Sequence, residues 1–326
     1  MTTNPIDHFK RSSLNFFTAH TVDRLSVKRQ DEAWIETRLQ DANTYFIPVW
    51  QSKNLFTNTE SPQPIFLNNL ELGDLLAQAD DIILLGEDKD RAYFALNLGH
   101  QTETDLASLT ATGQFQDLRL VGTSLKPEEG AILAHARAMV YWHQTHRFCG
   151  KCGQATRNAE GGYMRVCMAE ACQHKHFPRT DPAIIVLVNT GDKCLLGRQA
   201  VWPKGRYSTI AGFVEPGETL EHAVKREVME EAGIAVAEVT YHSSQPWPFP
   251  TSLMLGYMAK AASEDIHLND KELEDAQWFS RPELAAALQA DEVRLPPDIS
   301  ISHRLIETWF NEGNEGPLSQ FVSQSW

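Results

Sequence analysis

The segment AGFVEPGETLEHAVKREVMEEAGI, residues 211–234, decides how this chain is interpreted. Six of its residues are acidic, and three of them, Glu227, Glu230 and Glu231, lie within five positions just before Gly233. Side chains three or four positions apart on a helix are neighbours, and like charges at that spacing repel one another. Such a cluster is expected either on a solvated helix face or around bound cations.

Residues 219–232 are predicted to form a single helix. Apolar residues recur along one of its faces, at Leu220, Val224, Val228 and Ala232. The three glutamates fall within an arc of about 100° beside this stripe, and Gly233 is suited to end the helix as its C-cap. Oxygen-rich, negatively charged sites suit Mg²⁺ or Mn²⁺. The helix is therefore a candidate metal site, and a solvated acidic face is the alternative.

The full spacing of the segment is G-x5-E-x7-R-E-U-x-E-E-x-G-U, where U is apolar. Its members are Gly212, Glu218, Arg226, Glu227, Val228, Glu230, Glu231, Gly233 and Ile234. In this the chain resembles the Nudix hydrolases, which implies an α/β/α sandwich and hydrolysis of a nucleoside diphosphate linked to another moiety.

The resemblance also implies roles for single residues. Two or more Mg²⁺ or Mn²⁺ ions are expected per site, held by Glu227, Glu230 and Glu231, which are also the expected catalytic residues, together with Glu272 and the backbone carbonyl of Ala211. A solvated charge is the alternative for Glu272. Arg226 is expected to pair with Glu218 and to orient the carboxylates.

A second pattern is a cysteine-rich segment between residues 148 and 178. Two close pairs, Cys149/Cys152 and Cys167/Cys172, are separated by an insert of hairpin length. This is the pattern of a tetrahedral Cys₄ zinc site, which has no open position and is therefore structural. Two buried pairs or disulfides are the alternative, and His174 and His176 are alternative ligands. Cys194 lies in an apolar strand and is expected to be a core residue.

A third pattern, SQPWPFPTS at residues 244–252, alternates proline with aromatic residues. Because proline fixes φ, a stiff extended loop that presents its rings is expected; a rigid surface turn with buried aromatics is the alternative. Together with the cysteines and HFPRTDP at residues 176–182, the array resembles the NADH pyrophosphatase branch of the family. The resemblance implies substrate contacts at Phe177, Gln245, Trp247, Phe249, Ser252 and Ser302.

The chain as a whole has 326 residues and a formal net charge of −14. That charge argues against sequence-independent nucleic-acid binding, which rests on Lys and Arg. The longest strongly apolar run, residues 183–188, is far shorter than the roughly 20 residues of a membrane span. The termini show neither a signal-peptide pattern nor a targeting motif, so a cytoplasmic protein without a membrane partner is expected.

Four parts are predicted along the chain. They are an N-terminal α/β domain at 1–125, a helix and zinc ribbon at 126–180, a Nudix domain at 181–315 and a tail at 316–326. The resemblance implies hydrolysis of NAD(H) to nicotinamide mononucleotide and AMP, removal of NAD caps from RNA, and a homodimer. The alternatives are a general dinucleotide or ADP-ribose pyrophosphatase and, in another class, a zinc-ribbon nucleic-acid-binding protein.

Overall fold

The computed structural model describes residues 7–19, 22–269 and 271–322, and these form two compact units. The N-terminal unit comprises Ala19–Thr180 together with Trp247–Thr251. The C-terminal unit comprises Asp181–Pro246 and the described residues up to Thr18 and from Ser252 onward. The predicted division at 125/126, 180/181 and 315/316 stays a prediction, and residues 323–326 of its last part lie outside the described residues.

The N-terminal unit is built on a five-stranded sheet with the order β3-β4-β1-β2-β5. The strands are β1 (Thr44–Trp50), β2 (Lys53–Thr57), β3 (Asp81–Asp88), β4 (Arg91–Asn97) and β5 (Gly113–Gln116). Only β1 and β4 run parallel; the other neighbours are antiparallel. Four successive residues of β3, from Ile83 to Gly86, are buried, as expected for a strand covered on both faces.

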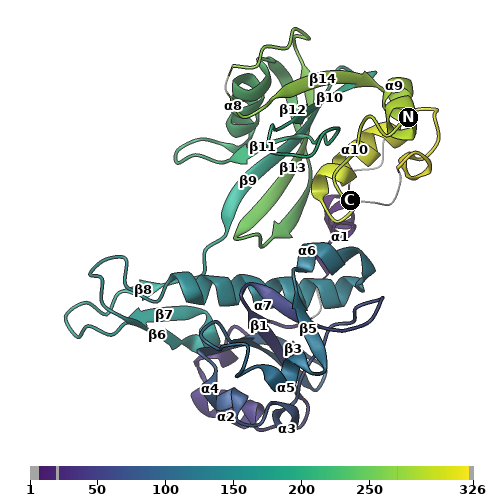
Figure 1. Ribbon diagram of the computed structural model, residues 1–326. Helices are drawn as coiled ribbons and strands as arrows, with labels where there is room; N and C mark the ends of the chain where they lie inside the picture. Colours follow the sequence, from purple (N-terminus) through teal and green to yellow (C-terminus); the bar gives the residue numbers. More distant parts are fainter. Residues whose placement is uncertain (1–6, 20–21, 270, 323–326) are drawn as a thin grey trace. The chain divides into compact units, whose positions relative to one another are not determined.

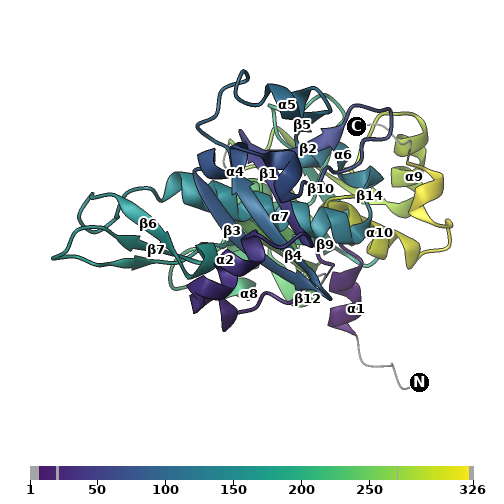
Figure 2. The same cartoon turned by 90° about the horizontal axis from the view of Figure 1, so that it is seen from below.

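Helices cover this sheet. The long helix α7 (Pro127–Thr145) packs on β1, β3 and β4 (Figure 2). A cluster of buried residues, among them Phe46, Leu55 and Phe94, packs with the shorter helices. These helices are α2 (Glu32–Leu39), α3 (Asn69–Leu72), α4 (Leu75–Gln78) and α5 (Ala107–Thr110); α6 (Leu118–Val121) precedes α7. The predicted helix at 127–146 is confirmed, with His146 as its C-cap.

After α7 the chain forms a small three-stranded antiparallel sheet, here called the ribbon. Its strands are β6 (Thr156–Ala159), β7 (Met164–Cys167) and β8 (Lys175–His176), in that order. A single turn of 3₁₀ helix, Glu160–Gly162, joins β6 to β7.

The C-terminal unit holds a mixed six-stranded sheet with the order β12-β13-β9-β10-β14, and β11 pairs with β9. The strands are β9 (Asp181–Asn189), β10 (Lys193–Arg198), β11 (Ile210–Phe213), β12 (Val236–Trp247), β13 (Ser252–Ala261) and β14 (Asp275–Ser280). Alternate residues of β9 enter two separate cores: Ile184 and Val186 pack on one face, Ile185 and Leu187 on the other.

Helices lie on both faces of this sheet (Figure 1). The first core includes residues of α8 (Leu220–Ala232), and the second includes residues of α9 (Arg281–Gln289) and α10 (Ile301–Asn311). The expected α/β/α sandwich is thereby confirmed. The short helix α1 (His8–Ser13) belongs to the same unit. No helix among the described residues is both long enough and apolar enough to cross a bilayer.

One local prediction is wrong. The segment 244–252 is not an extended loop: Ser244 to Trp247 end strand β12, and the next four residues form a turn. The amide of Phe249 donates to the carbonyl of Trp247 at 2.7 Å, which closes a three-residue turn around Pro248. The fixed φ of proline suits this inverse γ-turn, so the prolines bend the segment instead of extending it.

Candidate active site and zinc ribbon

Helix α8 forms as the sequence predicts. The side chain of Thr219 accepts a hydrogen bond from the amide of His222 and caps the N-terminus, and Gly233 ends the helix in the left-handed conformation. Val224 and Val228 are fully buried against the sheet, so the apolar stripe fixes the rotation of the helix. That rotation places the glutamates beside β11.

Arg226 lies at the centre of the acidic cluster. Its guanidinium bonds Glu218 at 2.6 and 3.2 Å, and one nitrogen, Nη1, reaches both Glu227 at 2.9 Å and Glu230 at 3.0 Å. A further bond of 2.9 Å runs from Nη2 to the carbonyl oxygen of Phe213 on β11. The expected pairing with Glu218 is thus present, and the same side chain holds two of the predicted metal ligands in place.

The electrostatics of the cluster favour a cation. Burial raises the pKa of Glu227, and the charges of Glu230 and Glu272 raise it further, against the lowering effect of Arg226. Glu272, in the loop before β14, therefore lies close enough to the cluster for its charge to act on Glu227. A divalent cation would relieve this repulsion, so the residues fit the ions that the sequence pattern implies.

Glu231 is the third glutamate near the C-terminal end of α8, and its side chain is buried. It is only 4 % exposed, and it lines a cavity of about 130 Å³ together with Ala211. The same cavity is lined by Gln199, Trp202, Ser208 and Thr209, none of which the sequence patterns singled out. The cavity wall thus includes a buried carboxylate and Ala211, two of the groups expected to hold the metal ions. The cavity is therefore the candidate reaction centre.

The four predicted zinc ligands converge in the ribbon. The sulfur atoms of Cys149, Cys152, Cys167 and Cys172 all lie within 4.8 Å of one another. The distance is 4.0 Å between Cys149 and Cys172 and 3.4 Å between Cys152 and Cys167. Tetrahedral zinc with bonds of about 2.3 Å requires sulfurs about 3.8 Å apart. The cluster fits zinc, and because all five cysteines are free thiols, the disulfide alternative does not hold.

The pKa values of two of the four thiols are shifted in opposite directions. Burial would raise the pKa of Cys149, but hydrogen bonds from His176 and from backbone amides lower it to about 5. Burial, together with the neighbouring thiols, raises the pKa of Cys167 to about 12. Zinc binds the thiolate form, so zinc binding at this cluster would release the protons that the thiols carry. His176 touches Cys149 at 3.4 Å, but neither His176 nor His174 joins the group among the residues that the structure describes.

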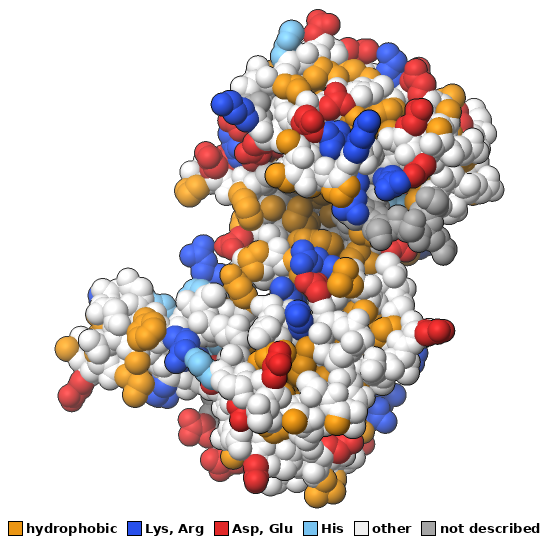
Figure 3. Space-filling model, viewed as in Figure 1, with side chains coloured by type: hydrophobic (Ala, Val, Ile, Leu, Met, Phe, Trp, Pro, Cys, Tyr) orange, Lys and Arg blue, Asp and Glu red, His pale blue; other side chains and the backbone are white. Residues whose placement is uncertain are grey.

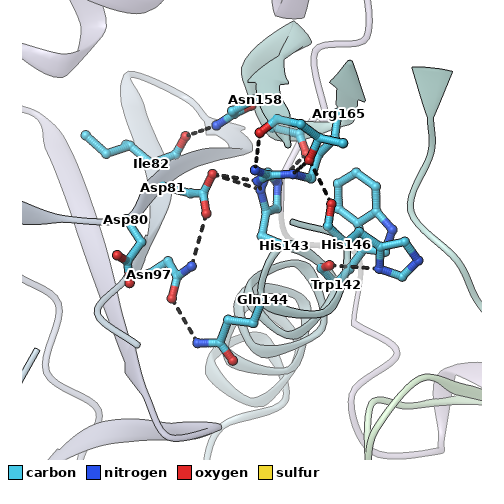
Figure 4. A network of polar contacts seen from close by, with 12 residues as sticks. Asp80, Asp81, Ile82, Asn97, Trp142, His143, Gln144, His146, Asn158 and Arg165 are labelled. Carbon is cyan, nitrogen blue, oxygen red and sulfur yellow. Dashed lines mark hydrogen bonds and ion pairs between the residues drawn. The ribbon is translucent and has the colours of Figure 1, made fainter. Parts of the chain in front are cut away.

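A buried polar network ties the ribbon to the N-terminal sheet (Figure 4). Arg165 of β7 donates to Asp81 of β3 at 2.8 Å and to the hydroxyl of Thr156 at 2.8 Å. His143 of α7 lies 3.1 Å from the same Asp81 oxygen, and its other ring nitrogen donates to the carbonyl of Gly162 at 2.8 Å. Burial opposes ionisation of Asp81, yet His143 and Arg165 outweigh it and hold the pKa below its ordinary value.

Comparison with known proteins agrees with this geometry. A model of the NUDIX domain matches residues 178–298, one of the NADH pyrophosphatase-like rudimentary NUDIX domain matches residues 43–142, and one of the NADH pyrophosphatase zinc ribbon domain matches residues 144–177. The chain is 36% identical to the NAD-capped RNA hydrolase NUDT12 of Homo sapiens over 90% of this chain and 73% of that protein. The chain belongs to the Nudix hydrolases.

Two further relatives carry related names. The mitochondrial NAD(P)H pyrophosphatase NUDT13 of Homo sapiens is 37% identical over 73% of this chain and 74% of its own length. The NAD-capped RNA hydrolase NudC of Mycobacterium bovis is 41% identical over 59% of this chain and 64% of its own. The match at residues 43–142 also gives the N-terminal unit an origin that its sequence did not suggest: it is a second, rudimentary Nudix domain.

The structure separates the predicted substrate residues of this Nudix hydrolase into exposed and buried ones. Phe177 of the ribbon is 59 % exposed, and Trp247, Phe249 and Ser252 are half-buried. Hydrophobic, basic and histidine side chains lie near one another on the surface of the ribbon (Figure 3). Substrate contact by these four residues stays a prediction.

Gln245 and Ser302 lie in the interior of the Nudix unit. Gln245 is fully buried and bonds three backbone groups, the carbonyls of Phe16 and Ile299 and the amide of Ile301. Ser302 is 1 % exposed, and its hydroxyl lies within 2.9 Å of the hydroxyls of Ser208 and Thr209, at the cavity wall. Both positions therefore suit residues that hold neighbouring elements in place.

One exposed ring was missed by sequence reasoning. Phe213 is 60 % exposed and lies two residues after Ala211 on β11, so both side chains point to the same face of the strand. Trp202 was also missed, since nothing in its local sequence marks it as a cavity residue.

Proposed function

We propose that this Nudix hydrolase cleaves the pyrophosphate bond of NAD(H) to give nicotinamide mononucleotide and AMP, and that it removes NAD caps from RNA by cutting the same linkage. The names of its relatives support both parts: NUDT12 and NudC are named NAD-capped RNA hydrolases, and NUDT13 is named an NAD(P)H pyrophosphatase. Capped RNA would be left with a 5′-monophosphate.

The observation that carries the proposal is the carboxylate array around Arg226, beside the cavity that Glu231 lines. Glu227, Glu230, Glu231 and Glu272, with the carbonyl oxygen of Ala211, are the groups that would hold Mg²⁺ or Mn²⁺. When bound, such ions neutralise the charge of a pyrophosphate and lower the pKa of a coordinated water. Hydrolysis of a pyrophosphate needs both effects.

The residues of the chain then have distinct tasks. Arg226 fixes the carboxylates of Glu227 and Glu230 so that they need not reorganise during the reaction. Glu231, which is buried at the cavity, would accept a proton from the attacking water. The exposed rings of Phe177 and Phe213 offer faces on which a flat base can stack.

Two alternatives make different predictions. A general dinucleotide or ADP-ribose pyrophosphatase would use the same carboxylates but would not prefer NADH. A zinc-ribbon nucleic-acid-binding protein would need no carboxylate array, and the net charge of −14 opposes broad RNA binding. The array weighs against the second alternative, and a substrate panel decides the first.

The experiment measures products from equal concentrations of NADH, ADP-ribose and diadenosine tetraphosphate in Mg²⁺ and, separately, in Mn²⁺. A higher kcat/KM for NADH, with AMP and reduced nicotinamide mononucleotide in equal amounts, supports the proposal. A parallel reaction with NAD-capped RNA should yield RNA with a 5′-monophosphate. Equal kcat/KM for all three small substrates would favour the general pyrophosphatase, and no product from any of them would contradict the proposal.

A cytoplasmic homodimer is the further part of the proposal. The absence of a long apolar helix among the described residues is compatible with many locations, and relatives include proteins named mitochondrial and chloroplastic. Light scattering after gel filtration tests the dimer: a mass near twice 36.7 kDa supports it, and a mass near 36.7 kDa contradicts it.

A further inference from the structure

The turn that follows β12 belongs to a different unit from the strands it connects. Strands β12 and β13 lie mainly in the C-terminal unit, whereas Trp247–Thr251 groups by its contacts with the N-terminal unit. Within that unit, the ring of Phe249 contacts Arg119 and Arg137. These contacts show which side chains hold Trp247–Thr251 in place.

The ring of Phe249 lies close to two arginines and a tryptophan. The guanidinium carbon of Arg137 lies 4.5 Å from the centre of its ring, and that of Arg119 lies 5.2 Å from it. The ring of Trp247 meets it edge to face at 5.0 Å. A cation within about 6 Å of a ring centre is attracted by the negative face of the ring. Phe249 thus makes two cation–π contacts and one aromatic contact.

Both guanidinium groups are themselves fixed. Arg137, on α7, is 7 % exposed, and its Nε donates to the carbonyl of Ser52 at 2.9 Å. Arg119, at the start of α6, donates to both oxygens of Asp117 at 3.0 and 2.7 Å. Asp117 also caps α6 by accepting from the amide of Arg119. The two cations are therefore held in place by the N-terminal unit.

Arg137 depends on the ring more than Arg119 does. Its Nη1 is buried and has no hydrogen-bond partner among the residues that the structure describes. A buried cation with an unbonded nitrogen is costly, and the cation–π contact with Phe249 offsets part of that cost. The contact therefore stabilises the buried arginine and the turn together.

We propose that Phe249 is a positioning residue, and that Arg137 and Arg119 act through it to fix the turn after β12. This assigns Phe249 a different role from the substrate contact expected from the sequence. The turn lies between Trp247 and Ser252, so fixing it holds these two predicted substrate contacts at a constant spacing. The inference rests on the proposed function, because it concerns how that site receives NADH.

The clamp formed by Phe249, Arg137 and Arg119 makes a specific kinetic prediction. None of the clamp residues is among the predicted metal ligands, so loosening the turn should weaken substrate binding and leave chemistry intact. Phe249→Leu keeps an apolar side chain and removes the ring face. Arg137→Met keeps an unbranched chain and removes the cation. Each should raise KM for NADH about 3- to 20-fold, with kcat within twofold of wild type.

A double-mutant cycle shows whether Arg137 and Phe249 affect KM for NADH through one shared contact or independently of each other. If Arg137 acts through Phe249, the variant carrying both substitutions should have a KM within twofold of the worse single variant. Phe249→Tyr keeps the ring and should remain near wild type. Arg91→Met is the matched control, since Arg91 lies over Tyr45 at 5.8 Å in the same unit, outside the clamp. Arg119→Met removes the more exposed arginine of the clamp. It tests the same contact if Arg137→Met does not fold.

Hydrogen exchange gives a readout that does not depend on activity. The amides of residues 247–252 should exchange faster in Phe249→Leu, Arg137→Met and Arg119→Met than in wild type, while α8 stays unchanged. Unchanged exchange in these variants, or multiplicative effects on KM in the double variant, would overturn the inference. Failure of the wild-type protein to cleave NADH would overturn the proposed function instead, and the exchange experiment would still decide the clamp.

Discussion

The carboxylate of Glu227 occupies the space that a side chain at Gly212 would fill. Gly212 lies in β11, where it pairs with Ile184 of β9, and any β-carbon added there would overlap the carboxyl group. The glycine therefore lets a helix side chain lie flat on the edge of the sheet. Arg226 holds the same carboxylate from the other direction at 2.9 Å.

The first prediction concerns this close approach. Gly212→Ala should displace the Glu227 carboxylate and lower kcat for NADH by about 10-fold or more, since a small misplacement of a catalytic group is costly. Steady-state assays with Mg²⁺ measure the effect. Gly150→Ala is the control, because a β-carbon there would meet only His176, at 3.9 Å. A Gly212→Ala enzyme with wild-type kcat would show that the position of Glu227 does not matter.

The second prediction concerns zinc. The purified chain should contain about one zinc per chain, and Cys152→Ser should lose it and unfold at a lower temperature, because metal binding and folding are coupled. Elemental analysis and thermal unfolding measure the two quantities. Cys194→Ala is the control, since this buried cysteine lies in β10 outside the cluster and should leave the zinc content unchanged. Wild-type protein without zinc would refute the assignment.

The third prediction concerns acid stability. Burial, together with the charges of Arg11, Arg304 and His8, lowers the pKa of His242 to about 4. The unfolded chain binds this proton at a higher pH, about 6.5, so stability falls as pH drops from about 6.5 and the loss levels off below about 4. The contribution amounts to at most about 3 kcal/mol.

Denaturant unfolding at several pH values measures this loss. His242→Gln should make the dependence between pH 6.5 and 4 less steep, whatever its effect at neutral pH, because it removes one titrating group, while His135, whose pKa burial lowers to about 3, still contributes. His222→Gln, at an exposed position of α8, should leave the dependence unchanged. An equally steep loss in His242→Gln would assign the acid sensitivity to another group.

The fourth prediction concerns base recognition. Stacking on an aromatic ring contributes about 1–3 kcal/mol per base in nucleic-acid sites. Phe177→Ala should therefore raise KM for NADH about 5- to 100-fold and leave Mg²⁺ dependence intact. A comparison with ADP-ribose shows which end is read: equal loss for both substrates means that the ring stacks on the shared adenine or only shapes the pocket. Unchanged KM for NADH would exclude Phe177 from the site.

The sequence was sufficient to predict features that depend on residues close to one another along the chain. The period of Val224 and Val228 and the caps at its ends determine α8, so its three glutamates could be placed beside the apolar stripe of the helix without the structure. The four cysteines could be predicted as one cluster because their spacing fits a ribbon. Long-range packing was not predictable: nothing local to Gln245 or Ser302 shows that their polar groups are taken by the backbone or by Ser208 and Thr209.

The clamp on Phe249 shows the same limit. Its partners, Arg119 and Arg137, are more than 100 positions away in the sequence, and each lies in a stretch that looks like an ordinary helix. The bend at Pro248 also depends on a hydrogen bond between residues two positions apart, which proline spacing alone did not indicate. The alternating prolines were compatible with both an extended loop and a turn.

The measurement that tests the central claim most directly is AMP release from NADH by wild type and Glu231→Gln in the presence of Mg²⁺ or Mn²⁺. The substitution keeps the shape of the side chain, removes one charge from the cavity and abolishes proton acceptance, so kcat should fall about 100-fold or more. Glu215→Gln, outside the cluster, serves as the control and should stay within twofold of wild type. Rapid AMP release by wild type with this loss is the predicted result; near-wild-type turnover by Glu231→Gln, or no AMP from wild type, would contradict the account.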